Sequence, residues 1–450
     1  MTGLPIAIIG AGPVGLAAAA QAHARGLPFV VLEAGDRAGT SVSEWGHVRV
    51  FSPWRYLVDA AARDLLQAPH NAGRCSGEAG WSEPDPEALP TGAELVASYL
   101  LPLAALPQLA PHIRYRSPVT AVTRFEMDRV RSAGRATTPF VVRLADGSEV
   151  LARAVIDASG TWQHPNHVGG NGLPAHGEGA GAVEVEPAMP DVLGTDRARF
   201  AGVHTVVVGA GHSAAGTLAA LAELATTTAG TSVTWLVRRR DAERAFGGGG
   251  TDALPARGAL GTQLQLLVDS GAVALMSDFC VQSLARTEGG RIEVASTTGD
   301  RVVADRLVAA TGFRPDHTLA AELRLDLDPI LGSTRALAPL IDPNEHSCGT
   351  VRPHGVDELT HPEPDYFVVG MKSYGRAPTF LMATGYEQVR SIVAALDGDW
   401  TAAREVHLDL PETGVCSADP IFQSTGETST PGTTAILPLV AVGGGGSCCG

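Results

Sequence analysis

Two glycine-rich loops, far apart in the chain, are the residues best suited to bind phosphate. The first reads Gly10-Ala11-Gly12-Pro13-Val14-Gly15 and the second reads Gly209-Ala210-Gly211-His212-Ser213-Ala214. In each loop the first glycine allows a tight turn, the second lets a pyrophosphate approach the backbone, and the third small residue lets a helix pack closely on a strand. A helix N-terminus that follows would offer free N–H groups and the positive end of its dipole. Each loop is therefore predicted to bind a dinucleotide.

The elements around these loops agree with that prediction. An apolar run precedes each loop, Ile6–Ile9 and Thr205–Val208, and an Ala/Leu-rich helical run follows it. Two such units in a chain of 450 residues indicate an enzyme that holds two dinucleotides, most economically a flavin and a nicotinamide. The predicted fold is α/β, with two Rossmann-like dinucleotide-binding domains and a flexible C-terminal tail.

The residues at the end of the strand that follows each loop indicate which cofactor that loop would bind. After the first loop, Phe29–Leu32 ends at Glu33, whose carboxylate would accept hydrogen bonds from ribose hydroxyls and repel a 2′-phosphate. This suits the AMP half of FAD, or NAD. After the second loop, Ser232–Val237 runs into Arg238-Arg239-Arg240, which can pair with a 2′-phosphate. We interpret the first site as FAD and the second as NADPH; a solvated arginine loop is the alternative at the second.

A second duplicated pattern supports the pair of sites. Asp146-Gly147 is followed by the run Ala154–Gly160, and Gly299-Asp300 is followed by Arg306–Gly312. Both patterns predict a β-hairpin and then a buried strand that ends in a small residue, Ser or Thr, and Gly. Each returning strand is expected to end near its own nucleotide, where Gly160 or Gly312 permits close backbone approach.

The order of these motifs resembles the two-dinucleotide-binding flavoproteins, which include flavin monooxygenases, N-hydroxylases and thioredoxin-reductase-like enzymes. The resemblance extends over residues 5–400. It implies an FAD domain formed by residues 1–165 and 311–400, with an NADPH domain, residues 195–310, inserted between them. Four further stretches resemble the flavin-dependent monooxygenase-like proteins of bacterial arsenic-resistance operons (ArsO type): His47–Trp54, Cys348–Gly355, Met371–Phe380 and Thr384–Arg390.

The resemblance also points to single residues near the flavin. Related reductases place an Asp where Met371 follows Gly370, so a backbone amide is expected to take over its contact with the ribityl chain. Trp54 is expected to pack around the flavin or in the core. Lys372, the only lysine, either places a charge near the isoalloxazine or makes a surface ion pair. His47 is a candidate acid/base because imidazole exchanges protons near neutral pH, or it is a hydrogen-bonded structural residue.

The C-terminal tail, residues 411–450, could bind a soft ion. It ends in Cys448-Cys449 after Gly443–Gly446, and Cys416 lies earlier in the same tail. Thiolates suit soft metals and, by the same logic, trivalent arsenic, and the glycines form a flexible tether. The tail could then reach a flavin site in its own chain or in the partner of a homodimer. The alternative is a disordered, inert terminus.

Composition limits the class of partner. A net charge of −15 argues against binding to nucleic acid or to anionic membranes. An apolar content of 44% indicates an ordinary globular protein, and no apolar run is long enough to cross a bilayer. The first strand begins almost at once, which leaves no room for a signal peptide, so a cytoplasmic enzyme with a small-molecule substrate is expected.

Three functions remain open on the sequence. The first is an FAD- and NADPH-dependent monooxygenase that oxygenates sulfur, nitrogen or trivalent arsenic. The second is a flavoprotein reductase or oxidase acting on a metalloid or thiol delivered by the terminal cysteines. No CxxC pair lies in the nicotinamide half, so this half lacks the pair of thiols that ordinary flavin-disulfide reductases place beside the flavin. The third is a non-enzymatic redox or metalloid sensor.

Overall fold

The computed structural model describes residues 3–68, 81–179, 183–247, 249–252, 254–345, 353–378 and 380–408. All of them belong to the first of two units of the chain, Met1–Ala418. The predicted tail with Cys416, Cys448 and Cys449 lies outside the described residues, as does the stretch from Cys348 to Arg352. None of the described helices is long and apolar enough to span a membrane.

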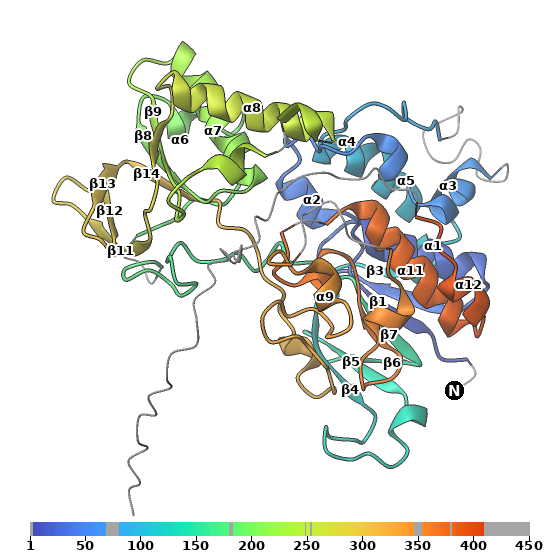
Figure 1. Cartoon of the computed structure of the whole chain (residues 1–450). Helices are drawn as coiled ribbons and strands as arrows, with labels where there is room; N and C mark the ends of the chain where they lie inside the picture. Colours follow the sequence, from blue (N-terminus) through green and yellow to red (C-terminus); the bar gives the residue numbers. More distant parts are fainter. Residues whose placement is uncertain are drawn as a thin grey trace, which may run out of the picture. The chain divides into compact units, whose positions relative to one another are not determined.

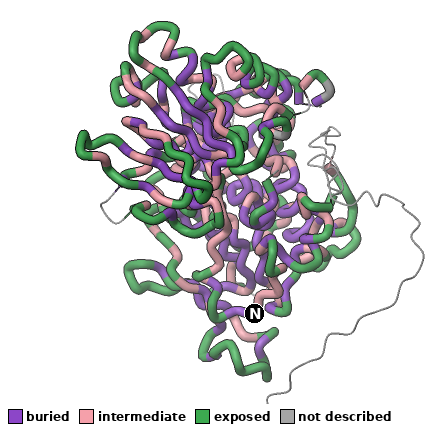
Figure 2. The backbone as a smooth tube through the Cα atoms, turned by 60° about the vertical axis from the view of Figure 1, so that its left-hand side comes forward, coloured by how far each residue is buried: buried purple, intermediate pink, exposed green. Residues whose placement is uncertain are grey.

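A parallel five-stranded sheet forms the centre of what we call the first lobe (Figure 1). β1, β2 and β7 are buried along their whole length, which explains why their sequences are continuous apolar runs rather than alternating ones. Figure 2 shows buried stretches of backbone in the interior of the fold and exposed stretches around them. In spatial order the strands are β15 (Tyr366–Val368), β7 (Ala154–Asp157), β1 (Ile6–Ile9), β2 (Phe29–Leu32) and β3 (Ile113–Arg114).

Helices cover this sheet. α1 (Pro13–Ala24) packs against α11 (Met382–Leu396) and α3 (Ala60–Gln67) (Figure 1). The buried alanines of α1, which include Ala17 and Ala18, have short side chains and so allow the neighbouring helices to approach closely. The short helices of this lobe are α2 (Thr40–Glu44), α9 (Ala338–Ile341), α10 (Val356–Leu359) and α12 (Trp400–Arg404).

The helix that begins after Thr91 is irregular. Thr91 and Glu94 form a capping box, but α4 (Gly92–Leu95) continues as a π-helical stretch, Val96–Leu100, and then as α5 (Leu101–Ala104). Pro102 has no N–H to donate to the carbonyl of Ser98, four residues earlier. The indole of Trp81 donates to that carbonyl instead, at 2.7 Å.

The second lobe is built around a parallel four-stranded sheet, with strand order β10 (Ala274–Met276), β9 (Ser232–Leu236), β8 (His204–Val208) and β14 (Arg306–Ala309). Its helices are α6 (Arg197–Phe200), α7 (His212–Thr227) and α8 (Pro255–Asp269). The predicted α/β fold with two Rossmann-like sheets is therefore confirmed. Both predicted hairpins belong to three-stranded antiparallel sheets: β4 (Val119–Arg124), β5 (Phe140–Leu144) and β6 (Glu149–Ala152), and β11 (Val281–Arg286), β12 (Ile292–Ser296) and β13 (Arg301–Ala304).

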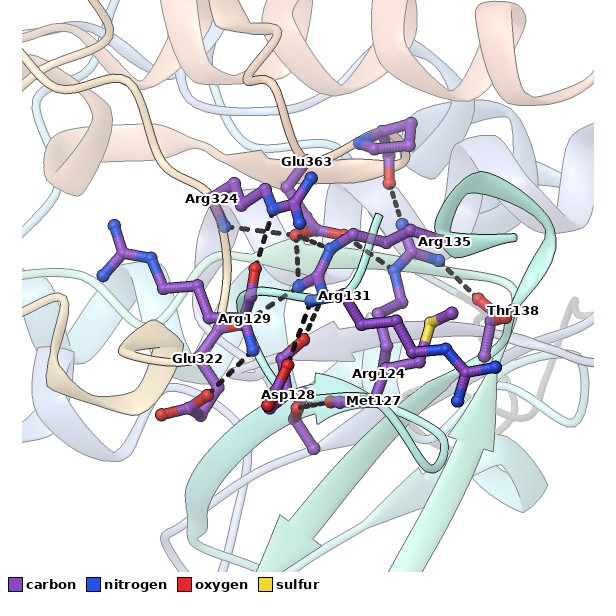
Figure 3. A network of polar contacts seen from close by, with 12 residues as sticks. Arg124, Met127, Asp128, Arg129, Arg131, Arg135, Thr138, Glu322, Arg324 and Glu363 are labelled. Atoms are coloured by element: carbon purple, nitrogen blue, oxygen red, sulfur yellow. Dashed lines mark hydrogen bonds and ion pairs between the residues drawn. The ribbon is translucent and has the colours of Figure 1, made fainter. Parts of the chain in front are cut away.

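A buried carboxylate joins the first of these antiparallel sheets to later parts of the chain (Figure 3). Glu363 is fully buried and accepts hydrogen bonds from the Nε of Arg124 at 2.7 Å and the Nε of Arg135 at 2.9 Å. The backbone N–H of Arg324 donates to it as well, at 3.1 Å. The Arg124 guanidinium also lies 3.6 Å from the centre of the Phe140 ring. Paired charge and full hydrogen bonding make this burial tolerable.

Asp59 is also buried, but among the described residues no arginine or lysine forms an ion pair with it of the kind that Glu363 has. It caps α3 by accepting from the N–H of Ala62 at 3.0 Å, and Gln21 donates to it at 3.2 Å. Burial raises the pKa of Asp59 to about 6, although these hydrogen bonds act in the opposite direction. Folding therefore disfavours the ionised form relative to the unfolded chain, so ionisation of Asp59 near neutral pH costs stability.

Replacing this carboxyl by an amide should change how stability depends on pH. Because the folded pKa of Asp59 lies above its unfolded value, the native protein loses about 2–3 kcal/mol from this group as pH rises from 4 to 7. Asp59→Asn keeps the cap and removes the charge, so its free energy of unfolding should exceed that of the wild type at pH 7.5 but not at pH 4.5. Chemical denaturation at both pH values measures this. Asp64→Asn, an exposed position on α3, is the control, and an Asp59→Asn effect that is equal at both pH values would contradict the expectation.

Candidate dinucleotide sites

The first glycine loop lies at the carboxyl end of β1, where the sheet order changes direction. β1 is flanked by β2 on one side and β7 on the other, and ligands of open α/β sheets bind in the crevice at such a point. Gly10 has a φ of +99°, and a Cβ there would lie 2.9 Å from the carbonyl oxygen of Ala158. A Cβ on Gly15 would lie 2.0 Å from the carbonyl oxygen of Gly10. Both glycines are therefore required by packing.

The other side of this loop is open. Apart from its two neighbours in the chain, no described residue has an atom within 4 Å of the position that a Cβ on Gly12 would take. Pro13 occupies the first turn of α1, where its missing N–H costs nothing. The loop thus leaves space at the helix N-terminus for a phosphate group. These residues fit the pyrophosphate of a dinucleotide.

Glu33 lies directly beside the loop, at the end of β2. Its carboxylate accepts from the backbone N–H of Ala11 at 2.6 Å and from that of Gly35 at 2.8 Å. A carboxylate oxygen can accept more than one hydrogen bond, so ribose hydroxyls can still bind there. The structure therefore gives Glu33 a loop-ordering role that the sequence did not reveal, and the ribose contact stays a prediction.

The second loop repeats the plan at the end of β8. Gly209 has a φ of +131°, and a Cβ there would lie 2.0 Å from the carbonyl oxygen of Ala310. The position that a Cβ on Gly211 would take is open, as it is at Gly12. Ala214, at the third small position, is fully buried. Each loop therefore touches the end of its own returning strand, β7 or β14, as the duplicated sequence pattern indicates.

The arginine run lies at the end of β9, at the margin of the second site. Arg238, Arg239 and Arg240 are all exposed. The guanidinium of Arg238 donates to the carbonyl of Gly170 at 3.1 Å, so this side chain already has a protein partner. The pairing of these arginines with a 2′-phosphate remains a prediction, and the contact of Arg238 with Gly170 favours Arg239 over Arg238 for that role.

Lys372 makes a buried ion pair, so the surface alternative is wrong. Its Nζ lies 2.7 Å from Asp157 Oδ2 and 3.0 Å from the Ser159 hydroxyl, and its side chain is 1% exposed. Asp157 also accepts from the hydroxyl of Tyr366 at 3.1 Å. Burial alone would raise the pKa of Asp157, but the Lys372 ammonium and Ser159 outweigh it and lower this pKa. Since Asp157 is paired with Ile9 across β7 and β1, the ion pair lies beneath the first site.

The segment after β15 also lies beside the first glycine loop. Gly370 has a φ of +69°, and a Cβ there would lie 3.3 Å from Val14 in α1. Its N–H donates to the side chain of Gln388 at 2.8 Å, and Met371 follows in the turn. Trp54 is 6% exposed and packs in the core of the first lobe. Gly370 therefore lies beside α1, at the first loop, while the packing of Trp54 agrees with the core alternative.

The two candidate catalytic residues occupy different surroundings. His47 is exposed, and it lies near Asp191, whose pKa is lowered mainly by the hydrogen bond from the backbone N–H of Thr195. No described contact joins His47 to the buried Lys372. The neighbouring Phe51 ring contacts the ring of His212, at the start of α7, with centroids 5.2 Å apart. The His47–Trp54 stretch thus meets the second glycine loop.

Two chain segments connect the lobes, and they lie side by side. Asn166 donates its N–H to the carbonyl of Gly312 at 2.8 Å, and the Thr311 hydroxyl donates to the Asn166 carbonyl at 2.7 Å. The rings of Trp162 and Phe313 have centroids 5.0 Å apart. Sequence reasoning missed Asn166 and Asp157. A charged residue at the end of the apolar run Ala154–Asp157 was the available signal for Asp157, whereas nothing in the sequence marked Asn166.

Comparisons with known proteins agree with this geometry. Residues 8–72 match the family model of the NAD(P)-binding Rossmann-like domain. No curated protein matches the chain. Similar solved structures include the bacillithiol disulfide reductase Bdr (YpdA) of Bacillus cereus, with a TM-score of 0.60 and 16% identity, covering 88% of this chain and 99% of that one.

Two oxygenating enzymes are similar to the chain as well. DfoA, the cadaverine monooxygenase of the desferrioxamine pathway of Erwinia amylovora, has a TM-score of 0.60 and 15% identity, covering 93% of this chain and 99% of its own. A flavin-containing monooxygenase of Stenotrophomonas maltophilia has a TM-score of 0.53 and 20% identity, covering 87% and 99%. Identities this low show the fold. The chain therefore has the fold of the flavoproteins with two dinucleotide-binding domains, a fold shared by monooxygenases and disulfide reductases.

The buried ion pair beneath the first site gives a stability prediction. Lys372→Met leaves Asp157 as an unpaired buried charge, which should lower the free energy of unfolding by about 3–5 kcal/mol. Adding Asp157→Asn removes that charge and should restore at least half of the loss. Chemical denaturation of the three proteins measures both effects.

An exposed ion pair is the matched control. Arg404 pairs with Asp357 at 2.9 Å, and both side chains are more than half exposed, so Arg404→Met should cost less than about 1 kcal/mol. If Lys372→Met costs no more than Arg404→Met, the pair does not stabilise the site.

Proposed function

We propose that the chain is an FAD- and NADPH-dependent oxidoreductase, and that it acts as a monooxygenase on a soft nucleophile in a small molecule. The observation that carries the proposal is the presence of two complete phosphate loops in one chain. Each has an open second glycine, Gly12 or Gly211, and a first glycine pressed against its own returning strand. When bound, a flavin and a nicotinamide supply hydride transfer and oxygen chemistry.

The protein's part in this reaction is to bind and orient. The loop from Gly10 to Gly15 would hold the FAD pyrophosphate, with Glu33 at the ribose. Gly211 and the N-terminus of α7 would hold the NADPH pyrophosphate, and Arg239 the 2′-phosphate. The proximity of Phe51 to His212 supports a meeting of the two cofactors between the lobes.

The proposed substrate class is inferred from similarity to other proteins. The similarity to two monooxygenases supports oxygenation of nitrogen or sulfur. The ArsO-type sequence stretches support trivalent arsenic, in a cytoplasmic arsenic-resistance role. The similarity to bacillithiol disulfide reductases supports a second candidate, reduction of a disulfide or metalloid. Cys280 is the one cysteine of the described residues, so a redox pair for this reaction would have to come from outside them.

One anaerobic experiment separates these functions. NADPH is titrated into FAD-loaded protein without oxygen while the flavin absorbance is followed, and air is then admitted with or without arsenite or a thiol substrate. A monooxygenase should bleach with about one equivalent of NADPH and consume oxygen in step with product. A reductase should turn over a disulfide before air is admitted. Flavin that NADPH never bleaches would contradict both enzymatic functions.

The nicotinamide choice is tested by Arg239→Ala. Removing a charge-assisted contact to the 2′-phosphate should raise the KM for NADPH by roughly 10- to 100-fold. The KM for NADH should stay unchanged because NADH has no such phosphate. Steady-state NAD(P)H oxidation measures both constants.

Arg291→Ala is the control, since Arg291 is exposed on the same lobe and pairs with Asp305 at 3.0 Å. It should leave both constants unchanged. Equal effects of Arg239→Ala on NADPH and NADH would refute 2′-phosphate recognition by this residue.

A further inference from the structure

The carbonyl group of the first glycine has different surroundings in the two loops. In the first lobe the carbonyl oxygen of Gly10 lies so close to α1 that only glycine fits at position 15. In the second lobe the matching helix position is Ala214, which carries a Cβ. The second loop therefore cannot repeat the close contact between loop and helix, and the carbonyl of its first glycine needs another partner.

The indole of Trp235 provides that partner. Its Nε1–H donates to the carbonyl oxygen of Gly209 at 2.6 Å, and the side chain is fully buried. Trp235 lies opposite Val207 in the β8–β9 register, just as Val31 lies opposite Ile8 in the β1–β2 register. The first lobe thus has valine, with no donor, where the second has tryptophan.

The hydrogen bond also fixes the direction of the next N–H. The carbonyl of Gly209 and the N–H of Ala210 belong to one planar trans peptide and point in opposite directions. In the first lobe the matching N–H, that of Ala11, is taken by Glu33 at 2.6 Å. In the second lobe Val237 follows β9 where Glu33 follows β2, and no described group accepts from the N–H of Ala210.

We propose that Trp235 is a positioning residue of the second dinucleotide site. Its indole holds the Gly209 carbonyl inward, so that the N–H of Ala210 faces outward and donates to an oxygen of the bound NADPH, on the ribose or its phosphate. In the first lobe the Glu33 carboxylate accepts from the matching N–H, whereas in the second lobe the ligand would be the acceptor. The N–H of Ala210 therefore favours an anionic group of the ligand at this position. The inference rests on the proposed use of NADPH by the second lobe.

Trp235→Phe tests the proposal, because it keeps an aromatic ring and removes the N–H. The NADP⁺ dissociation constant of FAD-loaded protein, measured by calorimetry, should rise by about tenfold, since the Gly209 carbonyl loses its partner. The KM for NADPH should rise with it, while kcat at saturating NADPH stays within about twofold. FAD content and the flavin spectrum should not change, because the first loop is untouched.

Two controls separate positioning from packing. Phe246→Leu disturbs the ring that contacts Trp235, with centroids 6.1 Å apart, but leaves the indole hydrogen bond in place. Trp400→Phe is the same substitution at a side chain that is 49% exposed in the first lobe. Both should bind NADP⁺ as the wild type does.

The outcomes are distinct. Unchanged NADP⁺ affinity in Trp235→Phe, or equal weakening by Phe246→Leu, would overturn the positioning role while NADPH oxidation by the wild type still supports the proposed function. A wild-type protein that binds FAD but not NADP⁺ would refute the proposed function and this inference with it. Selective weakening by Trp235→Phe supports both.

Discussion

The close approach of each glycine loop to a returning strand is the constraint on which the sites depend. Gly10 lies against the carbonyl of Ala158 and Gly209 against that of Ala310, and a side chain at either glycine would collide with backbone. The contact requires that the hairpin and the returning strand of each lobe be in place before the loop can adopt its shape. Formation of the phosphate sites is therefore coupled to folding of the whole lobe, not to the loop alone.

Buried polar groups then fix the surroundings of the first loop. The Lys372–Asp157 pair holds the segment after β15 against the end of β7, and Gln388 holds Gly370 from α11. Glu33 orders the loop from the other side through the N–H of Ala11. Isolated buried charges would be costly, and each of these groups has an ion-pair or hydrogen-bond partner. The second loop is held instead by a neutral side chain, since the indole of Trp235 donates to the carbonyl of Gly209.

Much of this architecture could be predicted from the sequence because it follows from local patterns. The glycine spacing, the apolar runs Ile6–Ile9 and Ser232–Val237 and the turns at Gly147 and Gly299 each point to one element, and the structure has all of them. The π-helical stretch at Val96–Leu100 could not be foreseen, because a helix pattern does not show that the indole N–H of Trp81 donates to the carbonyl of Ser98.

The contacts that shape the sites could not be predicted in the same way. Asp157 with Lys372, and Trp235 with Gly209, are far apart in the sequence, and only the sheet register brings them together. Lys372 was recognised as notable because it is the only lysine, but its sequence position did not show that its ion pair with Asp157 is buried rather than at the surface. Glu33 was assigned to the ribose from its place after β2, whereas its bond to Ala11 depends on the conformation of the loop.

We propose that one chain holds two different dinucleotides at the same time, one in each lobe. Equilibrium dialysis of the purified protein against labelled FAD and NADP⁺ together measures this occupancy. We expect one FAD and one NADP⁺ per chain, with neither displacing the other. Mutual displacement, with only one nucleotide bound per chain at saturation, would contradict it.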